Sequence, residues 1–475
     1  MNDIRQRLAC FIAVLATLAL SACALRGKPP APAPAMPQSF AEQAGPDAAV
    51  LAPDWWRSFG SAELASLIDA ALHANPDMAI AAEHVRQAEA QVRIAGATLF
   101  PVVDLRLGTT RVKTRPDGGD WNTADASSAT LSASYEIDLW GKNISGVRAA
   151  RSSLLATRFD LETLRLTLVA GVANGYFQVL SLRERIATAR ENLTTAERVF
   201  KVVESRVRNG AATELDLARQ QAAVLAQRAA IPPLELQERQ TLFALAILLG
   251  RQPEGFDAAA STVTDLAVPR VAPGLPATLL VRRPDLASAE AQLAAANANV
   301  VVARAALLPS ISLTGTAGVA SDVLLNFLNA PVAALAVGAS LLQPIFNAGR
   351  LRAQVDVAAS RERELVENYR KFVLAALADV ESALAAGSRS LDQEVLQEQV
   401  VVQARLSLKL AEIRYREGAD DLLTVLDAQR TLFQAEDQLA QIRLSRLQAS
   451  VGLFKALGGG WTIPNDTPTA ISEGR

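Results

Sequence analysis

The sequence contains one unit twice, at a constant offset of 208 residues. Five short segments return in this register: Asn75-Pro76-Asp77 as Arg283-Pro284-Asp285, Leu99-Phe100-Pro101 as Leu307-Leu308-Pro309, Gly141-Lys142 as Gly349-Arg350, Arg208-Asn209-Gly210 as Arg416-Glu417-Gly418, and Leu249-Gly250 as Leu457-Gly458. Chance does not keep five landmarks in one register, so the chain is a tandem duplication. We assign residues 55–250 to the first copy, 277–460 to the second, and the proline-rich residues 251–276 to a connector. The two copies are expected to share one architecture.

Each copy contains one helix of unusual length. Residues 141–208 hold no proline, and apolar or small side chains recur there at every seventh position, beside a second such row shifted by three or four residues. The first row comprises Val147, Leu154, Leu161, Leu168, Gly175, Leu182, Ala189, Ala196 and Val203, and the second comprises Val172, Val179, Ile186, Leu193, Phe200 and Val207. This spacing is typical of a coiled coil, and the helix would be about 100 Å long at its standard rise per residue. Residues 349–416 are its twin.

Two shorter helices accompany the long helix in each copy. The alanine-rich stretch from Pro76 to Phe100 opens with a proline and stops before another, which is typical of a helix. A further helix is expected between Gly210 and Gly250. Placed end to end, the two match the long helix in length, so each copy can form an antiparallel helical hairpin. The predicted helical ranges are 62–100 and 141–250 in the first copy, and 284–308 and 349–457 in the second.

Between the short and the long helix, the sequence period changes to two. Apolar side chains alternate with small polar ones in residues 102–140 and again in residues 310–346. The apolar rows are Ala129, Leu131, Ala133, Tyr135, Ile137 and Leu139 in the first copy, and Ile311, Leu313, Gly315, Ala317 and Val319 in the second. Such strands are typical of transmembrane β-barrels, although a hairpin on a soluble sheet has the same alternation. We predict one hairpin of two strands per copy.

Four strands per chain require oligomerisation if the sheet lies in a membrane. Four strands cannot close a barrel, and lipid does not tolerate open sheet edges. Bacterial barrels begin at about eight strands, so two chains are the minimum and three chains would give about twelve strands. The strand pattern does not decide between these numbers.

The N-terminus has the pattern of an export signal. Residues 1–22 carry two arginines ahead of a short uncharged apolar run and are predicted to be a signal peptide. The run ends in Leu20-Ser21-Ala22-Cys23, which resembles a bacterial lipobox, so Cys23 is predicted to carry a covalent lipid; an ordinary cleavage site is the alternative. The proline-rich residues 23–54 are expected to form a tether, and residues 461–475 a C-terminal tail.

Composition argues against several function classes. The net charge is −2 with dispersed Lys and Arg, so no nucleic-acid partner is expected. The chain has only two histidines, His73 and His84, and no phosphate-binding glycine motif, so we expect no enzyme, no metal site and no cofactor other than the lipid. A non-conducting coiled-coil lipoprotein of the cell envelope is the remaining alternative to a channel, but it leaves the duplicated amphipathic strands unexplained.

Several motifs together resemble one family. They are Trp55-Trp56-Arg57-Ser58-Phe59-Gly60, the duplicated Asn75-Pro76-Asp77 and Arg283-Pro284-Asp285, Tyr415-Arg416-Glu417-Gly418, and Leu426-Asp427-Ala428-Gln429. With the lipobox, they resemble the TolC family of outer-membrane efflux proteins, in its lipoprotein branch (NodT or OprM-like). The resemblance implies a homotrimer with a twelve-stranded β-barrel in the outer membrane and a helical α-barrel in the periplasm. It also implies small-molecule export together with a periplasmic adaptor and an inner-membrane pump, commonly of the RND class.

The resemblance also assigns functional residues near the ends of the hairpins. The adaptor-contacting tips are expected at Arg208, Gly210, Arg416 and Gly418. Leu423 and Asp427 match the residues that narrow the pore, and Asp216 with Tyr415 matches a hydrogen-bonded link of the closed state. The sequence departs from the prototype at Asp420, where an arginine is expected, and at Thr424, where a second pore aspartate is expected. The closed state is therefore expected to have fewer links than in the prototype.

Overall fold

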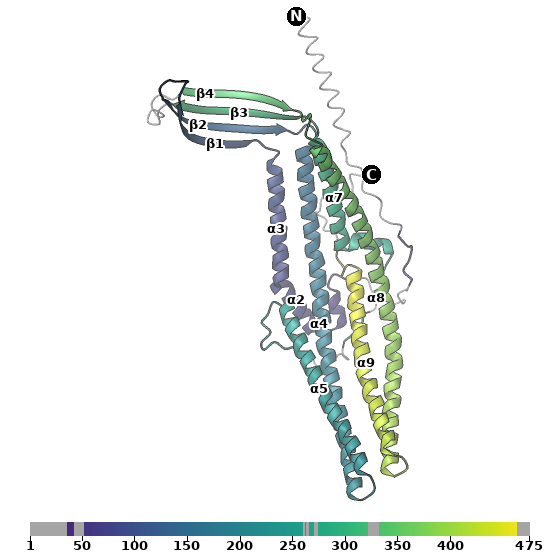
Figure 1. The fold of residues 1–475 in the computed structure, drawn as a ribbon. Coiled ribbons are helices and arrows are strands. Elements are labelled where there is room, and N and C mark those ends of the chain that lie inside the picture. The colour runs from purple at the N-terminus through teal and green to yellow at the C-terminus, as the bar shows by residue number, and fades with distance from the viewer. Residues whose placement is uncertain are drawn as a thin grey trace.

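A computed structural model describes residues 36–41, 52–259, 262, 266–269, 274–321 and 332–462. The predicted signal peptide, Cys23 and most of the tether and tail lie outside these residues. The chain is an elongated bundle of helices with a four-stranded sheet at one end and two helical turns at the other (Figure 1).

The two copies have the same series of elements. The first copy contains η2 (Trp55–Phe59), α2 (Ala62–Ala74), α3 (Pro76–Ala97), β1 (Val102–Thr114), β2 (Asn122–Ile137), α4 (Lys142–Arg208) and α5 (Glu214–Leu248). The second contains η3 (Pro276–Thr278), α6 (Leu279–Arg282), α7 (Pro284–Ala305), β3 (Ser310–Ser321), β4 (Val332–Leu342), α8 (Arg350–Arg416) and α9 (Leu422–Ala456). Each of α7, α8 and α9 begins and ends 208 residues after its counterpart, so the repeat read from the sequence extends to the ends of the helices.

The shorter helices line the long ones, as predicted. Figure 1 shows α3 and α5 one after the other along α4, and α4 contacts both. In the second copy, α8 contacts α7 and α9 in the same way. In addition, α4 contacts α7 and α9, and these contacts join the two copies. The pairing gives each 67-residue helix lateral support that an isolated helix would lack.

Some predicted boundaries were too wide. The first short helix ends at Ala97 instead of Phe100, because the N–H groups of residues 98–100 bond three residues back in a tight turn before Pro101. The strands end at Ile137 and Leu342 rather than at 140 and 346. At the first of these ends, the N–H of Leu139 donates to the Ile137 carbonyl over 3.0 Å, which turns the chain toward α4.

Two glycines allow the hairpins to close where their helices meet. Gly250 follows α5 at a φ of +64°, and a Cβ there would lie 2.2 Å from the carbonyl oxygen of Ala74. Its counterpart Gly458 follows α9 at +88°, and a Cβ there would lie 2.0 Å from the carbonyl oxygen of Arg282. No other residue fits either place without moving the backbone. This explains why the Leu-Gly pair occurs in both copies.

The main hydrophobic core lies around the middle of α4 and brings the N-terminal aromatic segment into contact with both copies. Trp55 stacks on Phe454 of α9 with ring centroids 4.7 Å apart, and Phe59 packs on Phe177 of α4 at 5.0 Å. All four side chains are buried. The segment Trp55–Phe59 therefore fastens the start of the first copy to the end of the second.

In the second half of α4, the first predicted row stays buried at Ala196 and Val203. The second row departs after Ile186, because Leu193 and Phe200 are only half-buried. The residues buried instead are Asn192 and Val199, each one position earlier. The second row there follows the first by three residues instead of four.

The four strands form one antiparallel sheet in the order β1-β2-β3-β4. The predicted hairpins β1-β2 and β3-β4 are confirmed, and β2 pairs with β3 across the repeat. The register places the apolar rows of all strands on one face. One such row is Leu105, Leu131, Ala317 and Leu335, and a row of the opposite face is Asp104, Ser132, Thr316 and Ala336. The apolar face is solvent-exposed in the single chain, with Leu335 80% and Val337 86% exposed.

A charge on the apolar face should impair insertion into the outer membrane. We expect Leu313→Arg to cost about 2 to 4 kcal/mol of insertion free energy if it lies near the bilayer midplane. The matched control is Ser312→Arg, because Ser312 lies on the opposite face beside Glu136, and it should insert normally. Recovery in the outer-membrane fraction and heat-modifiable migration measure the effect. Equal recovery of both variants would contradict the assignment of the faces.

Candidate pore entrance

The end of the molecule opposite the sheet consists of two helical tips, the α4–α5 turn and the α8–α9 turn (Figure 1). Gly210 and Gly418 adopt φ values of +70° and +77°. The N–H of Ala211 donates to the Arg206 carbonyl over 2.7 Å, and the N–H of Ala419 donates to the Arg414 carbonyl over 2.8 Å. Both turns are Schellman motifs, so glycine at these two positions is a backbone requirement.

All four predicted tip residues lie at these turns and are exposed. They are Arg208, Gly210, Arg416 and Gly418. Arg208 is near Glu204 of its own helix at 3.8 Å, which is a weak surface pair. The two arginines therefore keep their charge available at the end of the molecule.

Asp216 caps the start of α5. Its carboxylate accepts hydrogen bonds from the N–H of Thr213 at 3.0 Å and from the Thr213 hydroxyl at 2.8 Å, while the N–H of Asp216 donates to that hydroxyl at 3.2 Å. These bonds form a reciprocal capping box. The backbone bond first, and then the hydroxyl bond, lower the pKa of Asp216. The carboxylate is thus engaged within its own tip.

The second tip is held by an ion pair of its own. The guanidinium of Arg414 donates to both carboxylate oxygens of Asp420, at 2.6 and 3.2 Å. The hydrogen bond from Arg414 lowers the pKa of Asp420. Next to it, Asp421 caps α9 by accepting from the N–H of Thr424 at 3.1 Å and from its hydroxyl at 3.0 Å. The two residues that depart from the prototype, Asp420 and Thr424, therefore stabilise the turn.

The predicted bond between Asp216 and Tyr415 is not made in this structure. The Tyr415 side chain is buried, and its hydroxyl has no hydrogen-bond partner. Its ring instead lies under the guanidinium of Arg206, 4.7 Å from the ring centroid. Burial raises the pKa of the Tyr415 phenol, which keeps it neutral. The bond between Asp216 and Tyr415 stays a prediction for other states of the protein.

Sequence reasoning missed Arg206, the side chain that joins the two tips. From α4 it donates to the carbonyl of Tyr415 and, at 3.3 Å, to the carbonyl of Arg416. The repeat offered a signal, because Arg206 stands four residues before Gly210, as Arg414 stands four residues before Gly418. Nothing in the pattern indicated that it reaches across to the other copy.

Leu423 and Asp427 lie one helical turn apart on the same face of α9. The Leu423 side chain is 49% exposed and the Asp427 side chain 73% exposed. Asp427 accepts a hydrogen bond from Arg430 at 2.8 Å. Both line a groove of about 550 Å³ between α5 and α9, with Ala223, Ala226, Gln227, Leu426, Gln429, Arg430, Phe433, Gln434 and Asp437. The geometry thus brings the two predicted pore residues together on an open surface.

Among the described residues, no cluster of His, Cys, Asp or Glu has the composition of a metal site. No helix of the described part combines the length and the apolarity needed to cross a membrane.

A duplicated helical hairpin with an amphipathic sheet at one end and paired tips at the other is the architecture of an outer-membrane efflux channel. The family model of the outer membrane efflux protein matches residues 67–251 and 275–459, once per copy. The chain belongs to this family, and it is an outer-membrane component of an efflux system.

Curated relatives agree. The chain is 46% identical to the pyoverdine export outer membrane protein OpmQ of Pseudomonas putida, over 87% of this chain and 89% of the relative. It is 35% identical to the solvent efflux pump outer membrane protein SrpC of Pseudomonas putida, over 85% of this chain and 87% of the relative. Both are transport proteins by name. The alternative of a non-conducting structural lipoprotein is therefore wrong.

Solved structures share the fold. The CmeC outer membrane channel of Campylobacter jejuni superposes with a TM-score of 0.84 at 26% identity, covering 94% of this chain and 98% of that one. CusC, whose crystal structures concern transmembrane channel formation, superposes with a TM-score of 0.82 at 31% identity, covering 91% and 99%. The predicted duplicated, mainly helical fold with a four-stranded sheet is confirmed.

The role of Asp216 as a cap is testable. Asp216→Ala should destabilise the start of α5 by about 1 kcal/mol, because it removes half of the capping box. Backbone hydrogen exchange of residues 213–217 should be faster in Asp216→Ala than in wild type. Glu214→Ala is the control, because Glu214 lies in the same turn outside the capping box, and it should change this exchange little. Since the pKa of Asp216 is lowered, the wild-type cap should persist at neutral pH and weaken only as the pH falls through that lowered value. Equal exchange in both variants would contradict the assignment.

Proposed function

We propose that three copies of this chain close one continuous duct through which small molecules leave the cell, with Leu423 and Asp427 of each copy around its periplasmic entrance. The observation that carries the proposal is the sheet of four strands, apolar on one face and polar on the other, with the outer edges of β1 and β4 unpaired in the single chain. Membership in the efflux family, which acts at the outer membrane, supports it.

Closure of the sheet requires more than one copy, and three copies agree with the family resemblance. Both edge strands are long, with 13 residues in β1 and 11 in β4. Neither contains a proline, which would hinder pairing with a further strand. Unpaired backbone groups of this length are costly in lipid unless another chain pairs with them. Three chains would supply about twelve strands, enough for a water-filled barrel lined by the polar rows.

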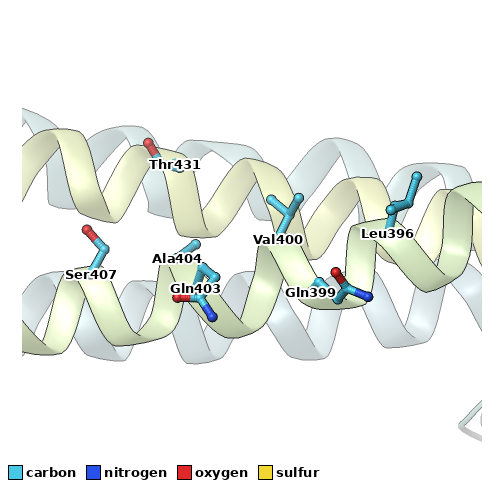
Figure 2. A pocket seen from close by; sticks show the side chains of 7 residues that line it. All are labelled: Leu396, Gln399, Val400, Gln403, Ala404, Ser407 and Thr431. Carbon is cyan, nitrogen blue, oxygen red and sulfur yellow. The ribbon is translucent and has the colours of Figure 1, made fainter.

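The helical surface offers a second contact for a neighbouring copy. On α8, apolar side chains are exposed at Leu396, Val400, Val402, Leu406, Leu410 and Ile413. A shallow groove of about 500 Å³ lies at Leu396 and Val400. Figure 2 shows the side chains that line it, which are Leu396, Gln399, Val400, Gln403, Ala404, Ser407 and Thr431. Leu396, Gln399, Val400 and Gln403 stand at positions i, i+3, i+4 and i+7, the arrangement of a hole that receives a coiled-coil knob. We propose that a helix of the next copy packs here.

The remaining assignments concern the partners. Exposed Arg208 and Arg416 with their glycine turns are the proposed contacts for a periplasmic adaptor, which joins the duct to an inner-membrane pump, most commonly of the RND class. Cys23 is the proposed site of the lipid that anchors the chain in the outer membrane. Its short distance in sequence from Phe40, which is buried in the main core, would keep the lipid close to the helical bundle.

Asp427→Ala tests the pore entrance. Three copies of Asp427 would concentrate cations along a narrow path, so the cation-over-anion permeability ratio should fall by about twofold or more in the variant. The matched control is Asp392→Ala on α8, because Asp392 is also an exposed aspartate paired with an arginine three residues away. Reversal potentials of single channels in planar bilayers measure the ratio.

One outcome would contradict the assignment of Asp427, and another would contradict the duct. An unchanged ratio in Asp427→Ala, with the trimer intact by mass in detergent, would remove Asp427 from the pore. A wild-type protein that remains a stable monomer with its full β content would refute the duct itself.

We further propose that the exported molecule is a siderophore of the pyoverdine type, because the identity of 46% to the pyoverdine exporter exceeds the 35% to the solvent pump component. Expression of this chain in Pseudomonas putida lacking its OpmQ should restore pyoverdine in the medium. Restoration of solvent tolerance in a strain lacking SrpC, without pyoverdine export, would contradict this proposal.

A further inference from the structure

The tip of α8 is bound by a side chain of the other copy. The last carbonyls of a helix have no partner within it. Here, Arg206 of α4 donates through one nitrogen to the carbonyls of Tyr415 and Arg416, and through the other to the carbonyl of Ala211 at 3.3 Å. One guanidinium thereby bridges the end of α8 and the α4–α5 turn.

The contact between Arg206 and Tyr415 depends on the charge, the flat shape and the burial of the guanidinium. The guanidinium covers the Tyr415 ring, and its positive charge lies at the negative end of the α8 dipole. The Nε of Arg206 is buried without a hydrogen-bond acceptor. The two terminal nitrogens of the guanidinium therefore make the hydrogen bonds that position this side chain. A lysine could not reproduce this contact, because a single ammonium cannot stack and bridge two backbone segments.

The counterpart in the repeat is used differently. Arg414 stands at the same position of the second copy, yet it pairs with Asp420 of its own tip. The next described hydrogen bond between α4 and α8 joins Arg198 and Glu412, two turns farther from the tips. At the tips themselves, Arg206 therefore supplies the described side-chain hydrogen bonds from one copy to the other, beside an apolar cluster that includes Val203 and Val425.

We infer that Arg206 positions the pore entrance: by fixing the end of α8 to the α4–α5 turn it holds the following turn, and with it Leu423 and Asp427, in the narrow arrangement. The inference rests on the proposed duct, and Arg206 is a positioning residue that contacts no transported molecule. Separation of the tips requires Arg206 to leave the carbonyls of Tyr415 and Arg416. Release of this contact is accordingly a step of opening.

Three variants test the inference in purified trimers. Arg206→Ala removes the contact, and Arg206→Lys keeps only its charge. Arg414→Ala is the matched control from the other copy. Open probability in planar bilayers is the main readout, with detergent mass and thermal unfolding to establish that the trimers are intact.

Arg206→Ala should raise open probability by about threefold to tenfold, the range expected for loss of a partly solvated, charge-assisted hydrogen bond. Arg206→Lys should be intermediate, and Arg414→Ala should remain close to wild type. Wild-type gating in Arg206→Ala, or an equal gain in Arg414→Ala, would overturn the inference. If Arg206→Ala does not assemble, Arg206→Lys decides in the same way.

A second measurement separates this inference from the duct. Hydrogen exchange of residues 209–213 and 415–419 should be faster in Arg206→Ala than in wild type. Exchange of 209–213 should not change in Arg414→Ala, since Arg414 bonds only within the second tip among the described contacts. If neither wild type nor variants conduct, the duct is refuted, and unchanged exchange in Arg206→Ala would then refute the inference independently.

Discussion

The structure depends on lateral packing along two 67-residue helices. In proteins most of the stability of a helix comes from packing its apolar face rather than from helix propensity, so each long helix needs a partner along its apolar stripe. In this chain, two shorter helices supply that cover, and they must meet without a gap. Gly250 and Gly458 make the junctions possible, because their missing Cβ atoms let the chain approach the carbonyls of Ala74 and Arg282. The helical hairpins therefore depend on two backbone contacts as well as on their apolar rows.

The same length separates two ends with different chemistry. At one end, the strands present an apolar face, with no described element covering it, and at the other the tips are rich in charge and capped by Thr213, Asp216 and Asp421. A sheet that is apolar on its outer face is stable only against lipid or protein, whereas charged tips are stable in water. This separation orients the chain with the sheet in the outer membrane and the tips in the periplasm.

The element types and the repeat could be predicted because they depend on local sequence patterns. Glycines mark both ends of the long helices, and the alternation of Ala129 to Ile137 gives the faces of the sheet, so element types and the repeat register follow from the sequence. The predicted row through Leu193 and Phe200 was wrong because both a three-residue and a four-residue step are compatible with coiled-coil spacing, and α4 uses the three-residue step there. The contact of Tyr415 with Arg206 was missed for another reason. Arg206 reaches across copies at a separation of 209 residues, which no local pattern encodes.

The two copies differ in charge at equivalent positions of α5 and α9, the helices that border the proposed entrance. Leu423 of α9 corresponds to Leu215 of α5, and both are exposed, but Asp427 corresponds to Arg219. If both helices faced the axis equally, three aspartates and three arginines would oppose each other and their fields would largely cancel. Arg219 instead acts on Asp216, whose pKa it helps to lower, and so serves the cap of the first tip. In the first copy, the charges of Asp216 and Arg219 thus stabilise the α4–α5 turn, and Arg206 binds the end of α8 in the second copy. In the proposed duct, the second copy is left free to present Asp427 to the path.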